Sequence, residues 1–391
     1  MIANSGSTDF GLVVEGLCNG NDTYQCQSAF RLRITAMEAL VAAKHDIAAF
    51  LEAMMSIDST TGKEGALGFA VKEFLKAEGF NIILQPIPAH PHRFNLIATW
   101  GQFTAPGPRI LFNTHLDTVP PFLPPVRKEH EIWGRGSNDA KGQIASQIFA
   151  LRRLIGEVPH LAGQVGLLLV VGEETDHIGM KEANKFSLQP EYLIVGEPTD
   201  MKFATLQKGA LKFKLTVKGT AAHSGYPHLG HSAIETLLDI LESLRHYSWP
   251  KSGENGDTTL NIGLINGGQA LNALAAEASA QIFIRVTESS KDLLAVVEKL
   301  VNGRADIEIL GINEPVRLTR PPIPYPSEPV AFNTDIPYFD YRNHCKGLFL
   351  FGPGSIQNAH SLKEFMPIDQ LEESVDVLVD LVKALFAKRG V

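Results

Sequence analysis

The sequence predicts an α/β fold with a smaller α+β unit inserted into it. Short, uninterrupted apolar runs alternate with segments whose apolar residues recur at helical spacing, which is typical of a largely parallel sheet flanked by helices. From residue 208 to 319 the strand-like segments alternate apolar and polar residues instead, as in an antiparallel sheet with one face in water. The uninterrupted apolar runs return after residue 320.

The elements of the larger unit follow from these patterns. An apolar stripe at helical spacing predicts a helix over 35–54, and a second helix is predicted over 64–76. Short apolar runs predict buried strands at 80–84, 95–100, 109–112, 166–171, 192–195 and 347–351. Another helix begins at Asp139 or the next residue, and a final helix covers 368–388.

The inserted unit has its own order of elements. Strands are predicted at 208–218, 259–265, 278–286 and 306–310, and helices at 232–246 and 291–302. This β-α-β-β-α-β order is typical of a ferredoxin-like unit. The proline-rich segment 320–326 is interpreted as a linker. The chain therefore divides into a larger domain of residues 1–207 and 320–391 and an inserted domain of 208–319.

Composition excludes several classes of protein. The 391 residues are 44% hydrophobic and 20% charged, which is ordinary for a globular chain. The net charge of −8 argues against nucleic acid or an anionic membrane as a partner. No apolar run reaches the length of a membrane span, and no signal peptide is evident, so we expect a cytoplasmic protein. Cys18 and Cys26 are expected to be free thiols, as in a reducing compartment.

Acidic and histidine side chains follow four of the predicted buried strands. These residues are His115, Asp117, Glu173, Glu174, Glu197 and His360. Asp139 stands where a helix begins. Because the carboxyl ends of parallel strands meet at one edge of a sheet, we expect these groups to converge there. Each motif alone has an ordinary alternative, such as a surface loop, a helix cap or a solvated pair of acids.

Together these residues form a ligand set for divalent metal ions. Two histidines and three carboxylates suit zinc, with cobalt and manganese as alternatives. Two such ions bring a charge of +4, and Asp139, Glu174, Glu197 and a bridging hydroxide bring −4, so the site is neutral. Asp139 is the natural bridge between two ions about 3.5–4 Å apart. The adjacent Glu173 and Glu174 suit a division of labour, in which one binds metal and the other moves protons.

Five motifs, in order, resemble those of the M20 metallopeptidase family. They are H-L-D-T-V-P-P from His115, G-R-G-S-N-D-A-K-G from Gly134, G-E-E-T from Gly172, G-E-P-T from Gly196 and G-P-G-S-I-Q-N-A-H ending at His360. The family includes acetylornithine deacetylase, succinyl-diaminopimelate desuccinylase, aminoacylase and glutamate carboxypeptidases. The resemblance implies a zinc-exopeptidase-like catalytic domain and makes the inserted domain a lid and dimerisation domain.

The resemblance also implies a role for each site residue. One ion would be held by His115, Asp139 and Glu197, and the other by Asp139, Glu174 and His360. Asp117 would orient His115, and Glu173 would be the general base. The lid would contribute His223, which reaches the active site of the partner in a homodimer and stabilises the oxyanion there. Asn272 and Arg285 would meet the substrate carboxylate, although the segment after Asn272 lacks a proline common in the family.

The expected activity is hydrolysis of an amide bond in a small N-acyl amino acid, as in acetylornithine deacetylase. The alternative within the family is a dipeptidase or carboxypeptidase. A catalytically inactive binding or scaffold relative is a rival of another class, although every ligand position is filled here. A single-metal enzyme is a further alternative. Outside this scheme, His177, His228 and His231 are interpreted as ordinary loop histidines, and Asp335 has no explanation.

Overall fold

The computed structural model of the protein describes residues 35–88 and 90–387. Its main sheet has six strands, which are, in spatial order, β1 (Phe80–Ile87), β2 (His90–Trp100), β6 (Val165–Val170), β3 (Ile110–His115), β7 (Tyr192–Val195) and β17 (Gly347–Leu350). The pairs from β6 to β17 are parallel, whereas β1 and β2 pair antiparallel with their neighbours. The predicted α/β class with a mixed, largely parallel sheet is therefore confirmed.

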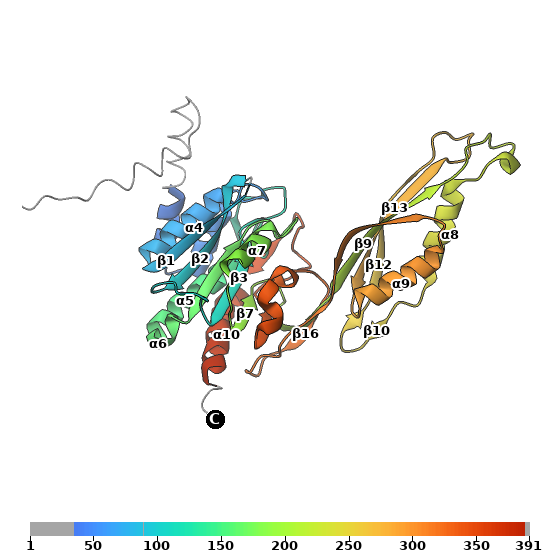
Figure 1. Cartoon of the computed structure of the whole chain (residues 1–391). Coiled ribbons are helices and arrows are strands. Elements are labelled where there is room, and N and C mark those ends of the chain that lie inside the picture. The colour runs from blue at the N-terminus through green and yellow to red at the C-terminus, as the bar shows by residue number, and fades with distance from the viewer. Residues whose placement is uncertain (1–34, 89, 388–391) are drawn as a thin grey trace, which may run out of the picture.

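Helices cover both faces of this sheet, which gives three layers (Figure 1). One face packs against α3 (Ile47–Met55), α4 (Gly65–Ala77), α5 (Lys141–Glu157) and α10 (Ile368–Ala387). The other packs against α7 (Ile178–Ala183) and the 3-10 helix η3 (Ile336–Tyr338). The central strands β3 and β6 are buried along their whole length, as parallel strands between two layers must be.

The predicted single helix over 35–54 is wrong. Residues 35–42 are helical, the chain turns at 43–45, and α3 begins at Ile47. Asp46 has an extended backbone, and its carboxylate accepts a hydrogen bond from the amide of Ala49 at 3.0 Å. It is therefore the N-cap of α3, which satisfies one of the free amides at the start of a helix. The apolar stripe continues through the break, so its spacing could not reveal it.

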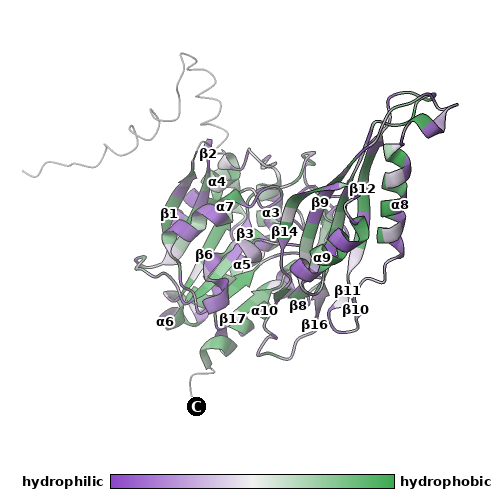
Figure 2. Ribbon diagram, turned by 45° about the vertical axis from the view of Figure 1, so that its right-hand side comes forward, coloured by the Kyte–Doolittle hydropathy of each residue, from purple (hydrophilic) through white to green (hydrophobic). Residues whose placement is uncertain are grey.

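The inserted unit is an antiparallel sheet with two helices on one face (Figure 2). Its elements are β9 (Gly209–Lys218), α8 (Ala233–His246), β12 (Thr259–Gly267), β13 (Glu277–Val286), α9 (Ser290–Val301) and β14 (Asp306–Asn313). The strand order is β12-β13-β9-β14, and the helices enclose a core of their own against it. The predicted order of elements is confirmed, and the domain boundaries at 208 and 319 stay a prediction.

Two small three-stranded sheets were not predicted. One joins the two units and consists of β15 (Val316–Arg317), β8 (Phe203–Gln207) and β16 (Ser327–Val330). The other consists of β18 (Phe365–Pro367), β5 (Glu131–Trp133) and β4 (Val126–Arg127). These strands have two to five residues, which is too short for an apolar period to show.

Two expectations about the whole chain are only partly covered by the described residues. Within 35–88 and 90–387, no helix combines the length and apolarity needed to cross a membrane. Cys18 and Cys26 lie outside the described residues. Cys345 is a free cysteine, and burial raises the pKa of its thiol to about 11, so it is protonated at neutral pH.

One group of ion pairs ties the amino-terminal ends of three parallel strands. Glu191 precedes β7, and its carboxylate accepts hydrogen bonds from Arg109 at 3.0 and 3.2 Å and from Lys346 at 3.1 Å. Arg109 precedes β3, and Lys346 precedes β17. The hydrogen bonds from Arg109, assisted by Lys346, lower the pKa of Glu191 to about 2.

We expect Glu191→Gln to lower the free energy of unfolding by about 1 kcal/mol at neutral pH. Because the folded-state pKa is lowered from 4.5 to about 2, the stabilisation is present above pH 4.5 and is lost as the pH falls towards 2. Denaturant unfolding of the variant and the wild type across this range measures the difference. A difference that stays constant down to the lowest pH would show that the charge of Glu191 is not its source.

Candidate metal centre

The carboxyl ends of the central strands bring the predicted site residues to one edge of the sheet. His115 is the last residue of β3, residues 172–174 follow β6, and Glu197 follows β7. His360 comes after β17, and Asp139 lies in the turn before α5. Since β6, β3, β7 and β17 are neighbours in the sheet, residues that are remote along the chain meet at one place.

Asp139 lies at the centre of this group. Its Oδ1 is 2.9 Å from Nε2 of His115, and its Oδ2 is 3.1 Å from Nε2 of His360. The same nitrogen of His360 lies 2.9 Å from Oε2 of Glu174. Oε1 of Glu197 lies 3.8 Å from Nε2 of His115. Each oxygen of Asp139 therefore faces a different histidine and glutamate, as expected of a carboxylate that bridges two ions.

The atoms that meet here fit a divalent metal ion. Among the described residues, Nε2 of His115, Oδ1 of Asp139 and Oε1 of Glu174 are buried without a hydrogen-bond partner, although the first two atoms lie 2.9 Å apart. The three residues offer ligand atoms that all lie within 4.8 Å of one another. Buried polar atoms are nearly always paired, so a group of unpaired ones that face each other indicates a cation site. Imidazole and carboxylate donors suit zinc, cobalt and manganese.

The charges of the group also favour a bound cation. Burial raises the pKa of Glu197 well above its usual range, against the effect of His115, and Asp139 adds to the rise. Burial, again with Asp139, raises the pKa of Glu174. Burial lowers the pKa of His115, but Asp117 and Asp139 outweigh it and raise that pKa well above the usual range. Acids crowded in this way stay ionised only when positive charge lies among them, which bound metal ions would supply.

Asp117 supports the site in two ways. Nδ1 of His115 lies 3.0 Å from the main-chain oxygen of Asp117. Because a carbonyl can only accept, Nδ1 carries a proton, so in the neutral ring Nε2 has the lone pair that a metal needs. The carboxylate of Asp117 is 3.5 Å from Nδ1 and accepts hydrogen bonds from the amides of 172–174 at 2.9–3.2 Å. The main-chain oxygen of Asp117 therefore orients His115 more closely than its carboxylate does. The carboxylate instead fixes the loop of residues 172–174, which carries the two adjacent glutamates.

A buried pair that was not predicted, Arg135 and Glu364, holds the turn of Asp139. Oε1 of Glu364 accepts hydrogen bonds from amides of the 136–139 turn at 2.9–3.3 Å. Arg135 donates to the other oxygen of Glu364 and to the main-chain oxygen of His360 at 3.3 Å. The pair therefore joins the two segments that carry Asp139 and His360. In the sequence, Glu364 looks like any surface acid.

Gly354 allows these two segments to approach each other. Its φ is +79°, and a Cβ atom at this position would lie 2.0 Å from Oδ1 of Asn138. Asn138 directly precedes Asp139. Any side chain at position 354 would both strain the backbone and displace the turn of Asp139. The position therefore needs a residue without a Cβ atom.

Glu173 lies beside the cluster, and its carboxylate is not held by the surrounding structure. No described residue hydrogen-bonds to its side chain, which is 11% exposed. Burial raises the pKa of Glu173 well above its usual range, and Glu197 adds to the rise. A partly accessible carboxylate with no structural hydrogen bond suits a group that takes up and returns a proton.

The structure separates the three predicted lid residues into two places. Arg285 lies near the end of β13 that joins the larger unit, opposite Ala210 of β9. Asn272 precedes the other end of β13, where His223 forms a bridge to the next residue, Ala273. Eight residue steps separate Glu277, the first residue of β13, from Arg285, which is about 26 Å at the usual rise per residue. That distant end, which we name the lid tip (residues 220–231 and 268–276), lies away from the main sheet (Figure 1).

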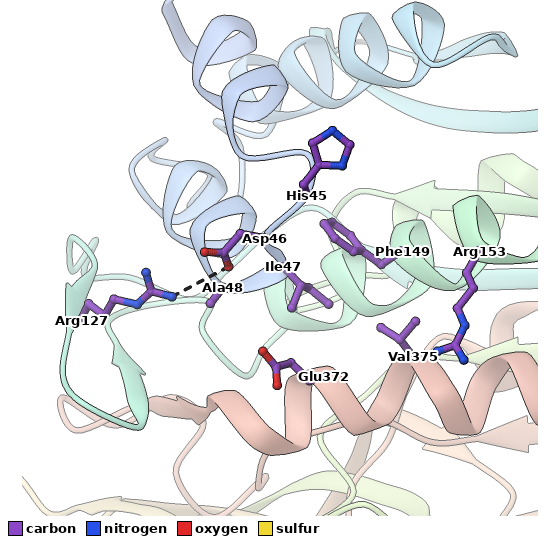
Figure 3. Close-up of a pocket in the computed structure, with 9 residues that line it drawn as sticks. All are labelled: His45, Asp46, Ile47, Ala48, Arg127, Phe149, Arg153, Glu372 and Val375. Carbon is purple, nitrogen blue, oxygen red and sulfur yellow. Dashed lines mark ion pairs between the residues drawn. The ribbon is translucent and has the colours of Figure 1, made fainter. Parts of the chain in front are cut away.

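A pocket elsewhere on the larger unit has a different character. It lies between α3, α5 and α10, and Arg127 and Arg153 line it (Figure 3). Arg127 pairs with Asp46 at 3.9 Å, and Arg153 pairs with Glu157 at 2.6 Å. Because its cations are already paired and none of the predicted metal ligands lines it, we place the function at the sheet edge.

We expect Glu364→Ala to lower the free energy of unfolding by about 3 kcal/mol, because Arg135 and the amides of the 136–139 turn lose a buried partner. Metal affinity should fall about 10–100-fold, since the turn of Asp139 loses its anchor. Chemical denaturation and competition with a chelator measure the two effects. Glu372→Ala, which removes an exposed acid on α10, is the matched control. Unchanged metal affinity in the Glu364 variant would contradict this role.

Comparisons with known proteins agree with this geometry. The family model described as peptidase dimerisation domain matches residues 205–307. A peptidase M20 domain-containing protein of Schizosaccharomyces pombe is 37% identical over 348 residues, which cover 88% of this chain and 86% of that protein. A probable carboxypeptidase of Aspergillus terreus is 34% identical over 368 residues, which cover 85% of this chain and 84% of that protein.

A solved structure supports the fold independently. The M20 family metallo-carboxypeptidase of Sulfolobus solfataricus superimposes with a TM-score of 0.67 at 15% identity, covering 87% of this chain and 99% of that chain. The sequence relatives extend over most of the chain at more than 30% identity and so establish the family. With its metal-binding geometry and its relatives taken together, the chain belongs to the M20 family of metal-dependent peptidases, which are hydrolases.

Proposed function

We propose that the chain is a metal-dependent carboxypeptidase that removes the C-terminal residue of short peptides. The observation that carries the proposal is the convergence of His115, His360, Glu174 and Glu197 on the two oxygens of Asp139. The name of the Aspergillus terreus relative, probable carboxypeptidase, favours a peptide over an N-acyl amino acid as substrate. Deacetylation, the first choice from the sequence, therefore becomes the second candidate.

Two divalent ions, with zinc as the first candidate, would be held as the sequence motifs imply. The ligands would be His115, Asp139 and Glu197 for one ion and Asp139, Glu174 and His360 for the other. Bound ions of this kind lower the pKa of water and polarise the carbonyl group under attack. The chain supplies the geometry: Asp139 presents one oxygen to each histidine, at 2.9 and 3.1 Å.

Glu173 would move the proton of the reaction. Its carboxylate takes a proton from the attacking water, whose oxygen adds to the carbonyl carbon of the peptide bond. As the C–N bond breaks, Glu173 returns the proton to the nitrogen of the leaving amine. The amides of 172–174, which donate to Asp117, fix the backbone from which this side chain projects.

Arg285 would recognise the C-terminal carboxylate of the substrate. Its guanidinium lies over the ring of Phe283, 4.1 Å from the centroid, and no carboxylate among the described residues pairs with it. Burial lowers its pKa, but a guanidinium remains charged. A partly buried guanidinium without an acidic partner suits a substrate carboxylate, which it can bind through two parallel hydrogen bonds.

The lid tip would act on a second copy of the chain. A main-chain hydrogen bond of 2.9 Å from Ser224 to Asn272 keeps Asn272 beside His223. In a homodimer each tip would reach the other metal centre, where His223 stabilises the oxyanion. The edge strand β12, with Leu264 and Ile265 exposed, offers an apolar surface and unpaired backbone groups for such a contact.

A substrate panel tests this function. With zinc, cobalt or manganese added, we expect the chain to release the C-terminal amino acid from short peptides and to leave C-terminal amides intact. Hydrolysis of N-acetyl amino acids should be slower than that of peptides. Faster release of acetate than of any amino acid would favour the deacetylase. A protein that carries two ions per chain and hydrolyses nothing would favour the inactive relative.

Within this panel, Arg285→Ala should raise KM for peptides about 10–100-fold and leave kcat nearly unchanged, because it removes binding made equally in the ground and transition states. Lys212→Ala is the matched control, since Lys212 lies 5.0 Å over the same Phe283 ring but is exposed. Steady-state kinetics on each variant provide the comparison. Equal effects of the two changes would show that the positive field of the sheet, and not Arg285 itself, attracts the substrate.

Mixing two inactive variants tests the shared site. Glu173→Ala should keep its metal and lose turnover, and His223→Ala should lose most of its turnover. After unfolding and refolding as a 1:1 mixture, about half of the dimers would pair one chain of each kind, and each mixed dimer has one intact site. We therefore expect about a quarter of the wild-type activity to return. If activity does not return although mixed dimers form, His223 does not act across the dimer.

A further inference from the structure

His177 occupies a position that its place in the sequence did not predict. The sequence around it indicates an ordinary loop histidine, yet its side chain is only 11% exposed. Its backbone is left-handed, with φ 55° and ψ 29°, which costs a non-glycine residue about 1 kcal/mol or more. Its Nδ1 lies 2.9 Å from Oδ1 of Asp335 and 3.8 Å from Oε1 of Glu173. A strained histidine is thus held between two acids, one of which is the candidate base.

Asp335 belongs to a loop that is fixed from the other side. The neighbouring Thr334 donates a hydrogen bond to Oε1 of Gln207 at 2.6 Å, and Nε2 of Gln207 donates to Asn333 at 2.9 Å. Gln207 is the last residue of β8 and is fully buried. Asp335 itself is 2% exposed. The carboxylate that faces His177 therefore has little freedom to move.

Tyr338 fixes the plane of the His177 ring. The two rings stack with centroids 3.9 Å apart and an angle of 18° between them. The hydroxyl of Tyr338 accepts a hydrogen bond from Asn313 at 2.7 Å, and its main-chain oxygen accepts one from Asn184 at 2.8 Å. Both the position and the orientation of the imidazole are thus determined by groups outside its own loop.

We propose that His177 is a positioning residue, held by Asp335 and Tyr338, that keeps the carboxylate of Glu173 directed at the scissile bond. The proposal rests on the proposed function, in which Glu173 moves the proton. No described residue hydrogen-bonds to the Glu173 side chain, and His177 is the only described basic residue within ion-pair distance of its carboxylate. Without it, the glutamate could rotate away from the metal centre.

Two other roles for His177 fit the contacts less well. A metal ligand would lie among the other ligands, whereas the described acids within ion-pair distance of His177 are Glu173 and Asp335, neither of which belongs to the predicted ligand set. A substrate-binding group would have a free polar atom or ring face, but Nδ1 of His177 lies 2.9 Å from Asp335 and Tyr338 stacks on its ring. A residue that is strained, buried and adjacent to an uncommitted acid is more consistent with support of that acid.

The kinetic test uses His177→Asn, because asparagine tolerates the left-handed backbone and removes the ring. We expect kcat to fall about 10–100-fold, since a small misplacement of a reacting group has an effect of this size. KM and the metal content should stay close to those of the wild type. His344→Asn, which changes an exposed histidine of the same unit, is the matched control and should have no effect. An unchanged kcat in the His177 variant would overturn the proposal.

Asp335→Asn tests the carboxylate that lies against His177. It should lower kcat less than His177→Asn does, because the amide oxygen can still accept the hydrogen bond of the imidazole. The double variant should lose no more activity than His177→Asn alone, since both changes act through one contact. Fully additive losses would contradict the proposal. So would a loss of metal, substrate affinity and thermal stability together, which indicates a purely structural role.

A measurement without substrate keeps this proposal separate from the proposed function. The amides of 175–177 donate to the main-chain oxygen of Gly172 at 2.7–3.4 Å, which closes the turn that carries Glu173. Hydrogen exchange of this turn should become several-fold faster in His177→Asn and stay unchanged in His344→Asn. If exchange is faster but the wild type cleaves no peptide, only the proposed function fails. If exchange is unchanged, His177 does not hold the turn, whatever the activity.

Discussion

Repulsion among buried carboxylates is the constraint on which the rest of the larger unit depends. Asp139, Glu174 and Glu197 have side chains that are at most 6% exposed, and Glu173 lies beside them. Such a group is stable only if cations separate the charges and if the surrounding backbone stops the acids from moving apart. Hydrogen bonds from main-chain amides hold this backbone in place. Asp117 accepts from the glutamate loop, and Glu364 accepts from the turn of Asp139.

The parallel sheet allows this arrangement because its two ends carry different groups of charged residues. At the carboxyl ends, backbone segments leave the sheet in one direction and bring ligands together from remote parts of the chain. At the amino ends, Glu191 pairs with both Arg109 and Lys346, which ties three strands together. Between the two ends lie strands buried on both faces. An apolar interior of this kind keeps the dielectric low, which strengthens both the repulsion among the acids and their attraction to cations.

The convergence of the residues proposed as metal ligands could be predicted from the sequence, because each lies in a short motif directly after an apolar run or at the start of a helix. Glu364 and His177 could not, since their contacts cross 225 and 158 residues and no local pattern marks them. His177 and His228 look alike in sequence, yet one is buried against an acid and the other is exposed. The helix break at Asp46 was missed for a related reason, because the apolar stripe serves the same core on both sides of it.

The inserted unit holds far apart the three residues that are proposed to act on one substrate. Arg285 and the pair of His223 and Asn272 lie at opposite ends of β13, about 26 Å apart. A short peptide is a few residues long, at about 3.4 Å per residue, so it cannot span this strand while one bond lies at the metal centre. If all three residues serve one substrate, the tip must come from another copy of the chain. The three proposed roles are therefore compatible with one another only in a dimer.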